Sequence, residues 1–415
     1  MMGKGKAQAM GSRDAKLPPR VDIAIIGGGI MGLSTAYHLS RVGTLSVAVL
    51  ERSYLVSGAS GRNGGGLRMQ WGDEGNVALM MESIEMCRSL AQELDINLWF
   101  RQGGYLFLAR SADGEARLTR NAELHRRVGA PTRLLSGAEA RELVPQLDVR
   151  DVRLAAFNPD DGVVFPWPFV WGYAGQAAAR GVTVRTHTAV ERIEPLADGL
   201  RLHLSTGEQL DADRVVNATG AWSIELNRAL GIELPNHPHR HEIMSSEPLK
   251  PFLDPLVVDL ASGLYFSQST RGEIVAGITM PSRPASTEAT PEPESESESE
   301  SATVDLTSSR RFLAHLGRAL TRVMPLTAQI RVLRQWSGPY DVSPDGDAIV
   351  GPSPGMPRLV QVCGFTGHGF MMAPAVGRLL ARLLAKGERH SMLDRWDPSR
   401  FSRGDSQRRE DMIIG

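Results

Sequence analysis

The sequence predicts an α/β chain, α+β overall, in which a discontinuous Rossmann-like nucleotide-binding domain carries an inserted antiparallel-sheet domain. Three observations predict this fold. A buried strand, a glycine loop and a helix follow one another near the amino terminus, hairpin patterns fill the middle, and another apolar strand with a helix comes near the carboxyl terminus. The first and last patterns are typical of parallel βαβ units, and the hairpins are typical of an antiparallel sheet.

The first βαβ unit begins at Val21. The run "VDIAIIG" is short and β-branched, as expected for a buried parallel strand, and it leads through a glycine loop into the helix "GLSTAYHLSRVG". Gly43 is placed to end that helix, and the next strand, "SVAVLE", ends at Glu51. The segment is therefore a complete strand, helix and strand.

The glycine loop matches a dinucleotide fingerprint. Gly27, Gly29 and Gly32 fit G-x-G-x-x-G, in which missing side chains let backbone N–H groups and the helix N-terminus approach a pyrophosphate. Glu51 stands at the end of the second strand, where a carboxylate can accept hydrogen bonds from a ribose. A tight turn in a packed α/β unit is the alternative, but the strand, helix and acidic residue together favour binding of ADP. The loop alone cannot distinguish NAD from FAD.

Later elements complete the prediction. Strands are expected at "GVTVRTH", at "LRLHLS" paired with "QLDADRVVNATG", at "LYFSQS" with "EIVAGI", and at "RLVQVCGF". A helix is expected from about Met372, with Pro374 in its first turn and an apolar face made by Val376, Leu379, Leu380, Leu383 and Leu384. The expected nucleotide-binding segments are 21–95, 150–235 and 336–390, and the inserted domain is 96–149 and 236–335. A flexible tail is expected at 1–20, a disordered Ser/Glu-rich insertion at 283–303 and a C-terminal tail at 391–415.

Composition excludes several classes of function. The 46 basic and 47 acidic residues give a net charge of -1, which predicts no nucleic-acid partner. Two cysteines exclude a disulfide framework and a Cys-rich metal site, and no apolar run is long enough for a transmembrane segment. The basic N-terminal stretch lacks the apolar core of a secretory signal, so we expect a cytoplasmic protein. A small-molecule ligand is the remaining expectation.

Three further glycine-containing turns point to a long cofactor. They are "SGASGRNGGGLR" at 57–68, "VVNATGAW" at 215–222 and "CGFTGHGFMMAPAVG" at 363–377, the last preceded by "SPDGDAIVG". An NAD enzyme does not need so many small-residue turns around one ligand, whereas a cofactor whose reactive ring lies far from its adenine does. The first glycine loop would hold one end of that cofactor, and the C-terminal turn would meet the other end.

These motifs together resemble the D-amino-acid oxidase superfamily of FAD enzymes. The resemblance extends from about Val21 to Gly387, without the Ser/Glu insertion. It rests on "IIGGGIMGLSTAYHL", Glu51, "GASGRNGGGLR", "NATGAW", "SPDGDAIVGPSP" and "GFTGHGFMMAPAVGRLLA". Within the superfamily the chain looks like glycine and sarcosine oxidases, especially the β subunits of heteromeric sarcosine oxidase and of proline, hydroxyproline and opine dehydrogenases, and a hydrogen cyanide synthase subunit. The resemblance implies a Rossmann-like FAD-binding domain of glutathione-reductase type.

The resemblance also implies which residues approach the cofactor. The ADP end is expected at Gly27, Gly29, Ile30, Met31, Gly32, Glu51 and Arg52, with Val190 near the adenine. The flavin end is expected at Ser60, Gly61, Arg62, Asn63, Gly64, Gly65, Ala218, Thr219, Gly220, Trp222, Gly338, Gly364, Phe365, Thr366, Gly367, His368, Gly369, Phe370 and Met371. Gly338 and Pro166 stand near the places where relatives attach flavins covalently, so we expect noncovalent FAD and no covalent FMN.

Four residues are candidates for the chemistry. By resemblance, Arg68 would meet a substrate carboxylate, for which a planar, always charged guanidinium is suited; a surface arginine in a loop is the alternative. Met371 stands where monomeric sarcosine oxidases carry a carboxylate-binding lysine. His368 would lie beside the flavin ring. Packing and hydrogen bonding that hold the turn explain this histidine at least as well as a role in proton transfer. Tyr265 is a candidate wall of the substrate pocket, or core packing of a strand.

The expected activity is oxidation of the C–N bond of a small amine or amino acid that carries a carboxylate. Hydride would pass to flavin N5, and the product imine would hydrolyse. The alternatives are an electron-transferring β subunit that needs partner chains, a non-catalytic flavin-fold scaffold, and an NAD dehydrogenase. Lysines occur only at 4, 6, 16, 250 and 386, none well placed to promote reaction with oxygen, which favours a dehydrogenase.

A metal site is the competing interpretation of "NHPHRHE". His237, His239 and His241 alternate along this stretch and would share one face of a strand. No cysteine or nearby carboxylate on that face completes a ligand set, so no metal is expected. We expect these histidines to line an interdomain strand instead.

Overall fold

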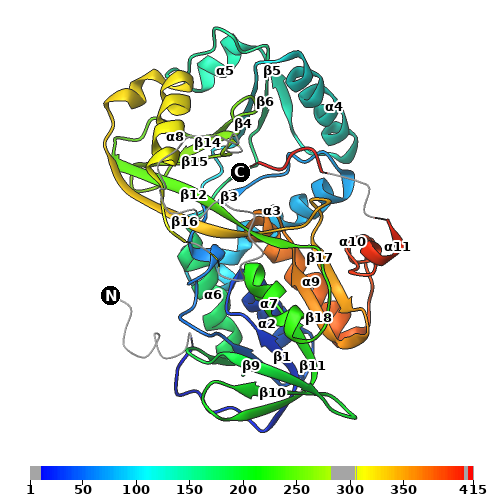
Figure 1. Cartoon of the computed structure of the whole chain (residues 1–415). Helices are drawn as coiled ribbons and strands as arrows, with labels where there is room; N and C mark the ends of the chain where they lie inside the picture. The colour runs from blue at the N-terminus through cyan, green and yellow to red at the C-terminus, as the bar shows by residue number, and fades with distance from the viewer. Residues whose placement is uncertain (1–10, 282–303, 305, 406–409, 415) are drawn as a thin grey trace, which may run out of the picture.

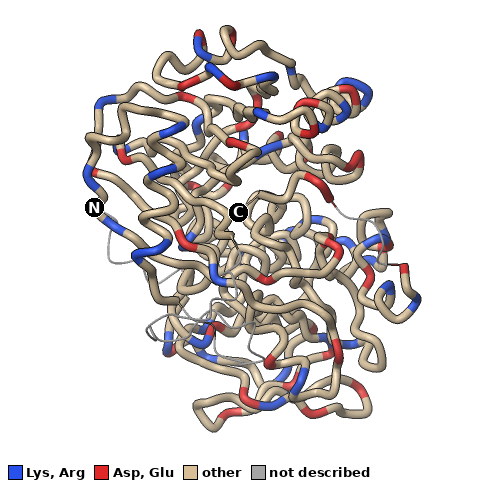
Figure 2. The backbone as a smooth tube through the Cα atoms, turned by 45° about the horizontal axis from the view of Figure 1, so that its top comes forward, with Lys and Arg blue, Asp and Glu red and all other residues tan. Residues whose placement is uncertain are grey.

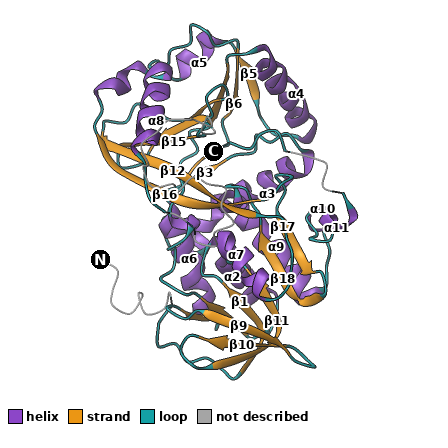
Figure 3. Cartoon of the chain, viewed as in Figure 1, coloured by secondary structure: helices purple, strands orange, loops and turns teal. Residues whose placement is uncertain are grey.

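The computed structural model describes residues 11–281, 304, 306–405 and 410–414. The expected Ser/Glu-rich insertion, 283–303, lies outside the described residues. The chain forms two halves, each built on a twisted sheet with helices packed against it (Figures 1 and 3). Lys and Arg alternate with Asp and Glu over both halves (Figure 2). Within the described part of the chain, no helix combines the length and the apolar character that crossing a membrane requires.

The first half confirms the predicted Rossmann-like sheet, whose strand order is β17-β18-β11-β1-β2-β8. The central strands β1 (Arg20–Ile26), β2 (Val47–Leu50), β8 (Thr183–Arg185), β11 (Gln209–Asn217) and β18 (Met356–Cys363) are parallel, and β17 (Ile349–Ser353) is antiparallel to β18. The predicted hairpin is also present, since β10 (Leu200–Leu204) pairs with β11 and with β9 (Val190–Pro195). Carboxyl ends of parallel strands are where ligands bind in such sheets.

Helices cover this sheet. They are α2 (Ile30–Val42), α3 (Glu74–Glu93), α6 (Pro166–Ala179), α7 (Ser223–Ala229) and α9 (Gly369–Lys386). The pair α2 and α9 is close: Ser34 donates to the Ala373 carbonyl at 2.7 Å, and a Cβ on Gly377 would lie 2.2 Å from the Ser34 hydroxyl. This pair brings the first glycine loop and the last glycine turn, 336 residues apart in sequence between Gly32 and His368 (368 − 32), to one side of the sheet.

The prediction for the start of α9 was wrong by three residues. The helix begins at Gly369 rather than near Met372, so Pro374 lies inside it and not in its first turn. The preceding turn already ends at His368, so the helix starts at Gly369. Phe370 and Met371 therefore belong to the helix, where both are buried. Proline inside a helix removes one backbone hydrogen bond.

The second half is the predicted antiparallel-sheet domain, with strand order β16-β12-β15-β14-β13-β4-β6-β5, except that β13 and β4 pair in parallel. Its strands are β4 (Tyr105–Ala109), β5 (Arg133–Leu135), β6 (Leu154–Asn158), β12 (His237–Pro248), β13 (Leu256–Asp259), β14 (Leu264–Gln268), β15 (Glu273–Ile278) and β16 (Val332–Val342). The helices α4 (Ala112–Val128), α5 (Gly137–Leu143) and α8 (Arg310–Val323) flank it. Phe312, Leu316 and Leu320 of α8 join Phe266 and Ile274 in its core.

Several short elements lie between the longer ones. They are β3 (Gly66–Leu67), which pairs with β7 (Gly162–Val163), and the 3₁₀ turns η1 (Ala59–Gly61), η2 (Gly220–Trp222) and η3 (Pro325–Gln329). Sheet membership differs from the expected segments at two places. Residues 154–158 pair with β4 although the expected nucleotide-binding segment begins at 150, and β16 pairs with β12 over its whole length although a boundary was expected at 336.

Both expected tails contain ordered contacts. Ser12 forms a parallel bridge with Arg185, because β8 is an edge strand with open backbone groups. Beyond residue 390 the chain forms α10 (Ser391–Arg395) and α11 (Arg400–Arg403). Trp396 is only 1% exposed, and the buried Arg400 pairs with Asp345 at 2.8 Å. A buried tryptophan and a buried ion pair anchor this part of the C-terminal segment.

Candidate active site

The β1–α2 turn has the shape of a dinucleotide cradle. Gly27 has φ +114, and a Cβ there would lie 2.4 Å from the Ala218 carbonyl; a Cβ on Gly32 would lie 2.1 Å from the Gly27 carbonyl. These two glycines are therefore required by close backbone packing. A Cβ on Gly29 would meet only the Ser60 hydroxyl, at 3.1 Å. Gly29 leaves space at the start of α2, where a pyrophosphate can approach.

Glu51 is held beside this turn. One carboxylate oxygen accepts from the Gly28 N–H and the other from the Ser53 N–H, both at 2.8 Å. A carboxylate oxygen has a second lone pair, so each can also accept from a ribose hydroxyl. Arg52, the next residue, stacks over the Trp222 ring with its guanidinium carbon 4.2 Å from the ring centroid. The residues expected at the ADP end thus fit the group.

The glycine-rich segment after Glu51 joins this turn to the second half of the molecule. The Ser60 hydroxyl accepts from the Ile30 N–H at 3.0 Å, at the N-terminus of α2. Asn63 donates to the Ser60 carbonyl and accepts from the Gly65 N–H, both at 2.8 Å. Gly65 has φ +72, and a Cβ on it would lie 2.0 Å from the Val164 carbonyl. The loop conformation therefore depends on the small residues that the sequence places there.

One further turn closes on the same region. The Ala218 N–H donates to the Ile26 carbonyl at 2.9 Å, so the "NATG" turn lies directly against the end of β1, and Thr219 and Gly220 continue it into η2. Trp167 and Trp336 hold the glycine-rich segment in place, because their indole N–H groups donate to the Gly61 and Arg62 carbonyls. Val190 is the first residue of β9, opposite Leu204, and follows Thr188, whose N–H donates to the Glu51 carbonyl at 2.9 Å.

The C-terminal turn is held by one buried carboxylate. The Asp341 carboxylate accepts from the Gly364 N–H at 2.6 Å, and the Asp341 backbone carbonyl accepts from the Thr366 N–H at 2.8 Å. Burial raises the pKa of Asp341 to about 6, against opposing hydrogen bonds from Asn236 and Gly364. Gly367 has φ +81, and a Cβ there would lie 2.4 Å from the Tyr340 ring. Phe365 and Gly369 complete the turn, from which α9 begins.

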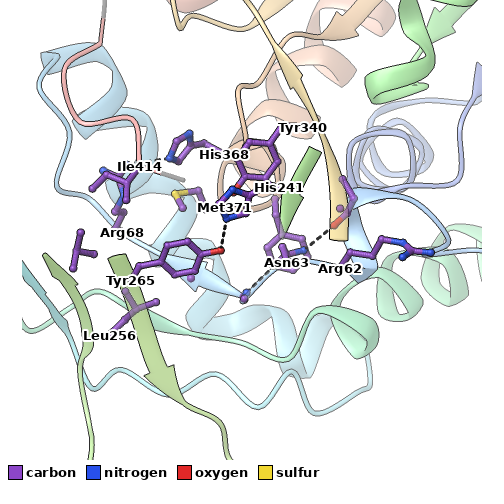
Figure 4. Close-up of a pocket in the computed structure, with 18 of the residues that line it drawn as sticks. Arg62, Asn63, Arg68, His241, Leu256, Tyr265, Tyr340, His368, Met371 and Ile414 are labelled. Carbon is purple, nitrogen blue, oxygen red and sulfur yellow. Dashed lines mark hydrogen bonds between the residues drawn. The ribbon is translucent and has the colours of Figure 1, made fainter. Parts of the chain in front are cut away.

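A cavity lies where the glycine-rich segment, the C-terminal turn and the second sheet meet (Figure 4). Of the predicted residues, it is lined by Arg62, Asn63, Gly64, Gly65, Arg68, Tyr265, Gly338, Gly367, His368, Phe370 and Met371. The residues expected at the ADP end do not line this cavity and surround the β1–α2 turn instead. Sequence reasoning missed Ala59, Gly66, Tyr105, Leu256, Val258, Tyr340 and Ile414 as lining residues, and treated His241 only as a metal candidate.

Arg68 is at the end of this cavity and is only 2% exposed. Its guanidinium donates to the backbone carbonyl of Gln70, to that of Met412 at 2.5 Å, and to Nε2 of His368 at 3.2 Å. It also lies over the Trp71 ring, 4.1 Å from the centroid. Arg68 is thus a buried cation that is stacked and hydrogen-bonded, and the alternative of a surface arginine does not describe it.

His368 is neutral in this arrangement. Burial lowers its pKa to about 3, and the Arg68 charge acts in the same direction. Because a guanidinium can only donate, Nε2 of His368 is the acceptor of that hydrogen bond and the ring proton is on Nδ1. Its ring also contacts Trp71 edge-on, at 4.8 Å between centroids. The hydrogen bond from Arg68 engages the Nε2 lone pair, so in this arrangement the His368 ring has no free acceptor for a proton.

The opposite wall is aromatic. His241 from β12 stacks between Tyr265 of β14 and Tyr340 of β16, with centroid distances of 5.8 and 4.7 Å, and its Nε2 is 3.0 Å from the Tyr265 hydroxyl. Burial lowers the pKa of His241 to about 3, and burial together with the Tyr340 hydroxyl raises the pKa of Tyr265 well above its usual value. All three groups are therefore uncharged. Figure 4 shows this wall facing Arg68 and Met371.

The metal interpretation finds no support in the described residues. His241 turns into the cavity, whereas His237 is exposed at the start of β12. No cluster of three or more His, Cys, Asp or Glu in the described ranges could hold a metal ion. The strand that carries these histidines runs along β16, between the two halves (Figure 1).

A parallel sheet with a dinucleotide turn at its first strand, a second glycine turn on the same side and a cavity against an antiparallel sheet define a flavin-dependent class of oxidoreductase. Comparison with known proteins agrees with this class. Residues 22–383 match the family described as "DAO: FAD dependent oxidoreductase", and the chain belongs to that family. It is an FAD-dependent oxidoreductase, and the predicted family, fold class and cofactor are confirmed.

Individual relatives align over almost the whole chain. Sarcosine oxidase subunit beta of Rhizobium meliloti (strain 1021) is 30% identical over 392 residues, which cover 93% of this chain and 89% of the relative. The crystal structure of L-proline dehydrogenase from P. horikoshii superposes with a TM-score of 0.84 at 32% identity, over 94% of this chain and 99% of the other. Glycine oxidase from Geobacillus kaustophilus gives a TM-score of 0.79 at 25% identity, over 92% and 99%.

Proposed function

We propose that the chain oxidises the C–N bond of a small amine or amino acid that carries a carboxylate, and that the imine formed hydrolyses. The names of its relatives support this class, because they include a sarcosine oxidase subunit, a proline dehydrogenase and a glycine oxidase. Bound FAD supplies the hydride acceptor, at flavin N5. Gly27, Gly29, Gly32 and Glu51 would hold its ADP end, and the turns at 60–65 and 364–371 would hold the ring.

The observation that carries the proposal is the charge of the cavity wall. Its charged lining residues are Arg62 and Arg68, and no acidic side chain lines it in the described part of the chain. Arg62 is directed to the Ser57 and Ser337 carbonyls, each at 3.1 Å. Arg68 is therefore the better candidate for a substrate carboxylate, since it is buried and a buried cation gains most from an anionic partner.

The chain also favours a neutral amine. The buried Arg68 and the positive end of α9, an 18-residue helix, face the cavity, and both raise the cost of a protonated amine there. The uncharged His241–Tyr265 pair can accept or donate a hydrogen bond to that amine without adding charge. The same helix N-terminus stabilises negative charge on a group bound at the turn. Met371 lines the cavity with an uncharged thioether.

Anaerobic mixing tests this function. Purified protein that retains FAD is mixed with sarcosine, glycine, proline, hydroxyproline and an opine, and loss of the oxidised flavin absorbance is followed. We expect at least one of these carboxylated amines to bleach the flavin, and Arg68→Ala to slow the bleaching. A protein that neither binds FAD nor responds to any amine is not an amine oxidoreductase, and an unaffected Arg68→Ala rate removes the assignment of that residue.

A second candidate is the β subunit of a heteromeric amine dehydrogenase. Similarity to a sarcosine oxidase subunit beta along 93% of the chain favours it. In that case partner chains co-purify with the protein from its own cells, and the isolated chain bleaches its flavin but does not complete turnover with an external acceptor. Steady-state turnover of the isolated chain with oxygen would instead indicate a self-sufficient oxidase.

A further inference from the structure

The C-terminal segment Glu410–Ile414 lies in the substrate side of the site. Its first residue fixes it to the start of α3. One carboxylate oxygen of Glu410 accepts from the Gly72 N–H at 2.7 Å and the Met412 N–H at 3.0 Å, and the other accepts from the Asn76 amide at 2.9 Å. Glu410 is only 6% exposed. A buried carboxylate with three donors is a specific anchor, because a buried charge without partners is costly.

A second anchor comes from the other half of the molecule. The Asp411 carbonyl accepts from the Arg117 guanidinium of α4 at 2.8 Å, and the Asp411 side chain lies 3.9 Å from Arg120 and 3.5 Å from the Asn121 amide. The segment therefore connects α3 with α4, and Figure 1 shows it between these two helices.

The rest of the segment reaches the cavity. Met412 is 1% exposed and packs among Tyr105, Phe107 and Leu118. Its carbonyl accepts from Nη2 of Arg68 at 2.5 Å. Ile414 is one of the cavity-lining residues and lies beside Arg68 in Figure 4. The segment thus supplies both a hydrogen-bond acceptor to the proposed carboxylate site and an apolar wall next to it.

The acceptor matters because of guanidinium geometry. A carboxylate binds arginine in a bidentate way either through Nη1 and Nη2 or through Nε and Nη2, so Nη2 takes part in both modes. Nη2 of Arg68 has two hydrogens, and its partners are the Met412 carbonyl and Nε2 of His368. A bidentate ligand must therefore displace one of them. A neutral carbonyl is the weaker acceptor by about a factor of two compared with an ionised oxygen.

We propose that Glu410–Ile414 is a specificity-determining part of the substrate site. The Met412 carbonyl competes with the ligand carboxylate for Nη2 of Arg68, and Ile414 limits the space beside it. An anionic ligand displaces the carbonyl, whereas a neutral ligand of the same shape does not. This proposal rests on the proposed function, since it assigns the segment to the same carboxylate site, but its test uses binding and needs no turnover.

The test compares propionate with propionamide as non-reacting probes. Each is titrated into FAD-loaded protein, and the perturbation of the visible flavin spectrum gives the dissociation constant. The variants are a chain ending at residue 409, Ile414→Ala, and Arg117→Ala, which loosens the segment from α4 without touching the cavity. Arg127→Ala, at an exposed position of the same helix, is the matched control.

We expect the chain ending at 409 and Arg117→Ala to bind propionate more tightly, by about tenfold for full removal of a competing hydrogen bond to a charged group. Binding of propionamide should change much less, and Arg127→Ala should match the parent chain. Ile414→Ala should admit longer carboxylates. Unchanged or weaker propionate binding in Arg117→Ala, or no gain in binding of longer carboxylates in Ile414→Ala, in protein that keeps FAD, overturns the proposal even if the shortened chain fails to fold.

Hydrogen exchange of the full chain gives an independent readout. Propionate should speed amide exchange in the peptide that contains residues 410–414, because the contact between Met412 and Arg68 is released, and propionamide should not. Equal exchange with both probes overturns the proposal. Failure of the proposed function is distinguishable, because then no amine bleaches the flavin whatever the exchange of this segment shows.

Discussion

Two neighbouring glycines separate the folding role of the β1–α2 turn from its cofactor role. In Gly32→Ala the new methyl lies 2.1 Å from the Gly27 carbonyl oxygen and 3.1 Å from Ile25. A helix interior normally favours alanine over glycine by about 1 kcal/mol, but overpacking against backbone costs about 1–3 kcal/mol. The contact with the backbone oxygen leaves little room to relax, so the fold should lose stability.

Gly29→Ala differs in each respect. Gly29 has φ −83 and ψ −179, which alanine adopts without strain, and the new methyl meets only the Ser60 hydroxyl at 3.1 Å. The reduced freedom of the unfolded chain even favours the variant by about 0.4–1 kcal/mol. The methyl does enter the space where the pyrophosphate would lie against the start of α2, and we expect FAD affinity to fall at least tenfold, about 1.4 kcal/mol.

The assay has two measurements on flavin-stripped protein. Thermal unfolding reports the fold, and quenching of flavin fluorescence during titration with FAD reports binding. Gly29→Ala should unfold at or slightly above the parent temperature but bind FAD weakly, whereas Gly32→Ala should unfold at a lower temperature. Parent-like FAD affinity in Gly29→Ala would refute the location of the pyrophosphate at this turn.

Three further predictions concern the cavity. Arg68→Lys keeps the charge but loses the planar fork, so KM for carboxylated amines should rise about tenfold or more with a smaller change in kcat; equal changes for the corresponding amides would contradict a carboxylate contact. Tyr265→Phe removes the hydroxyl that meets His241, and weaker amine binding with an unchanged flavin spectrum is expected in stopped-flow traces; parent-like binding would leave Tyr265 as a wall only. Finally, the pKa values of His241 and His368 in the folded state, about 3, lie below the usual 6.5. As pH drops from about 6.5 towards 3, these imidazoles are protonated in the unfolded chain but not in the folded one, so stability should fall over this range. Melting temperature against pH should show a shallower fall in His368→Gln, while the exposed-site control His237→Gln should retain the parent slope.

The sequence predicts the first half of the fold well because its signals are local. A strand, glycine loop and helix occupy adjacent residues, and Gly27 and Gly32 are demanded by contacts within one βαβ unit and with the neighbouring turn at Ala218. The start of α9 was misplaced because the preceding turn is set by Asp341 and Tyr340, which belong to another strand. Local pattern cannot show that constraint.

The aromatic wall of the cavity could be predicted only in part. Tyr265 was a candidate, but its neighbours His241 and Tyr340 come from two other strands. The three meet only through the register of β15 with β14 and β12, and of β12 with β16. The alternation of histidines along the strand indicated that they share one face. It did not indicate which residues of other strands that face contacts. Knowledge of the pairing order was needed.

The C-terminal segment shows a different limit. It follows a polar, charged stretch, and the only signal in the sequence is the short apolar run Met412–Ile414 after it. An apolar run at the end of a polar tail predicts docking somewhere, but the site depends on a buried glutamate anchor at α3 and an arginine of α4. Asn76, the partner in α3, is 334 residues from Glu410 in the chain, and Arg117, the partner in α4, is 294 residues from Asp411.

We expect the cavity to bind an amine whose own carboxylate contacts Arg68, beside the flavin. The most direct measurement is the anaerobic rate of flavin bleaching by a carboxylated amine and by its uncharged primary amide, at equal concentrations and pH. We expect faster bleaching by the carboxylated amine by about tenfold or more, with the difference reduced in Arg68→Lys and lost in Arg68→Ala. Equal rates for the two amines in the parent protein would contradict it.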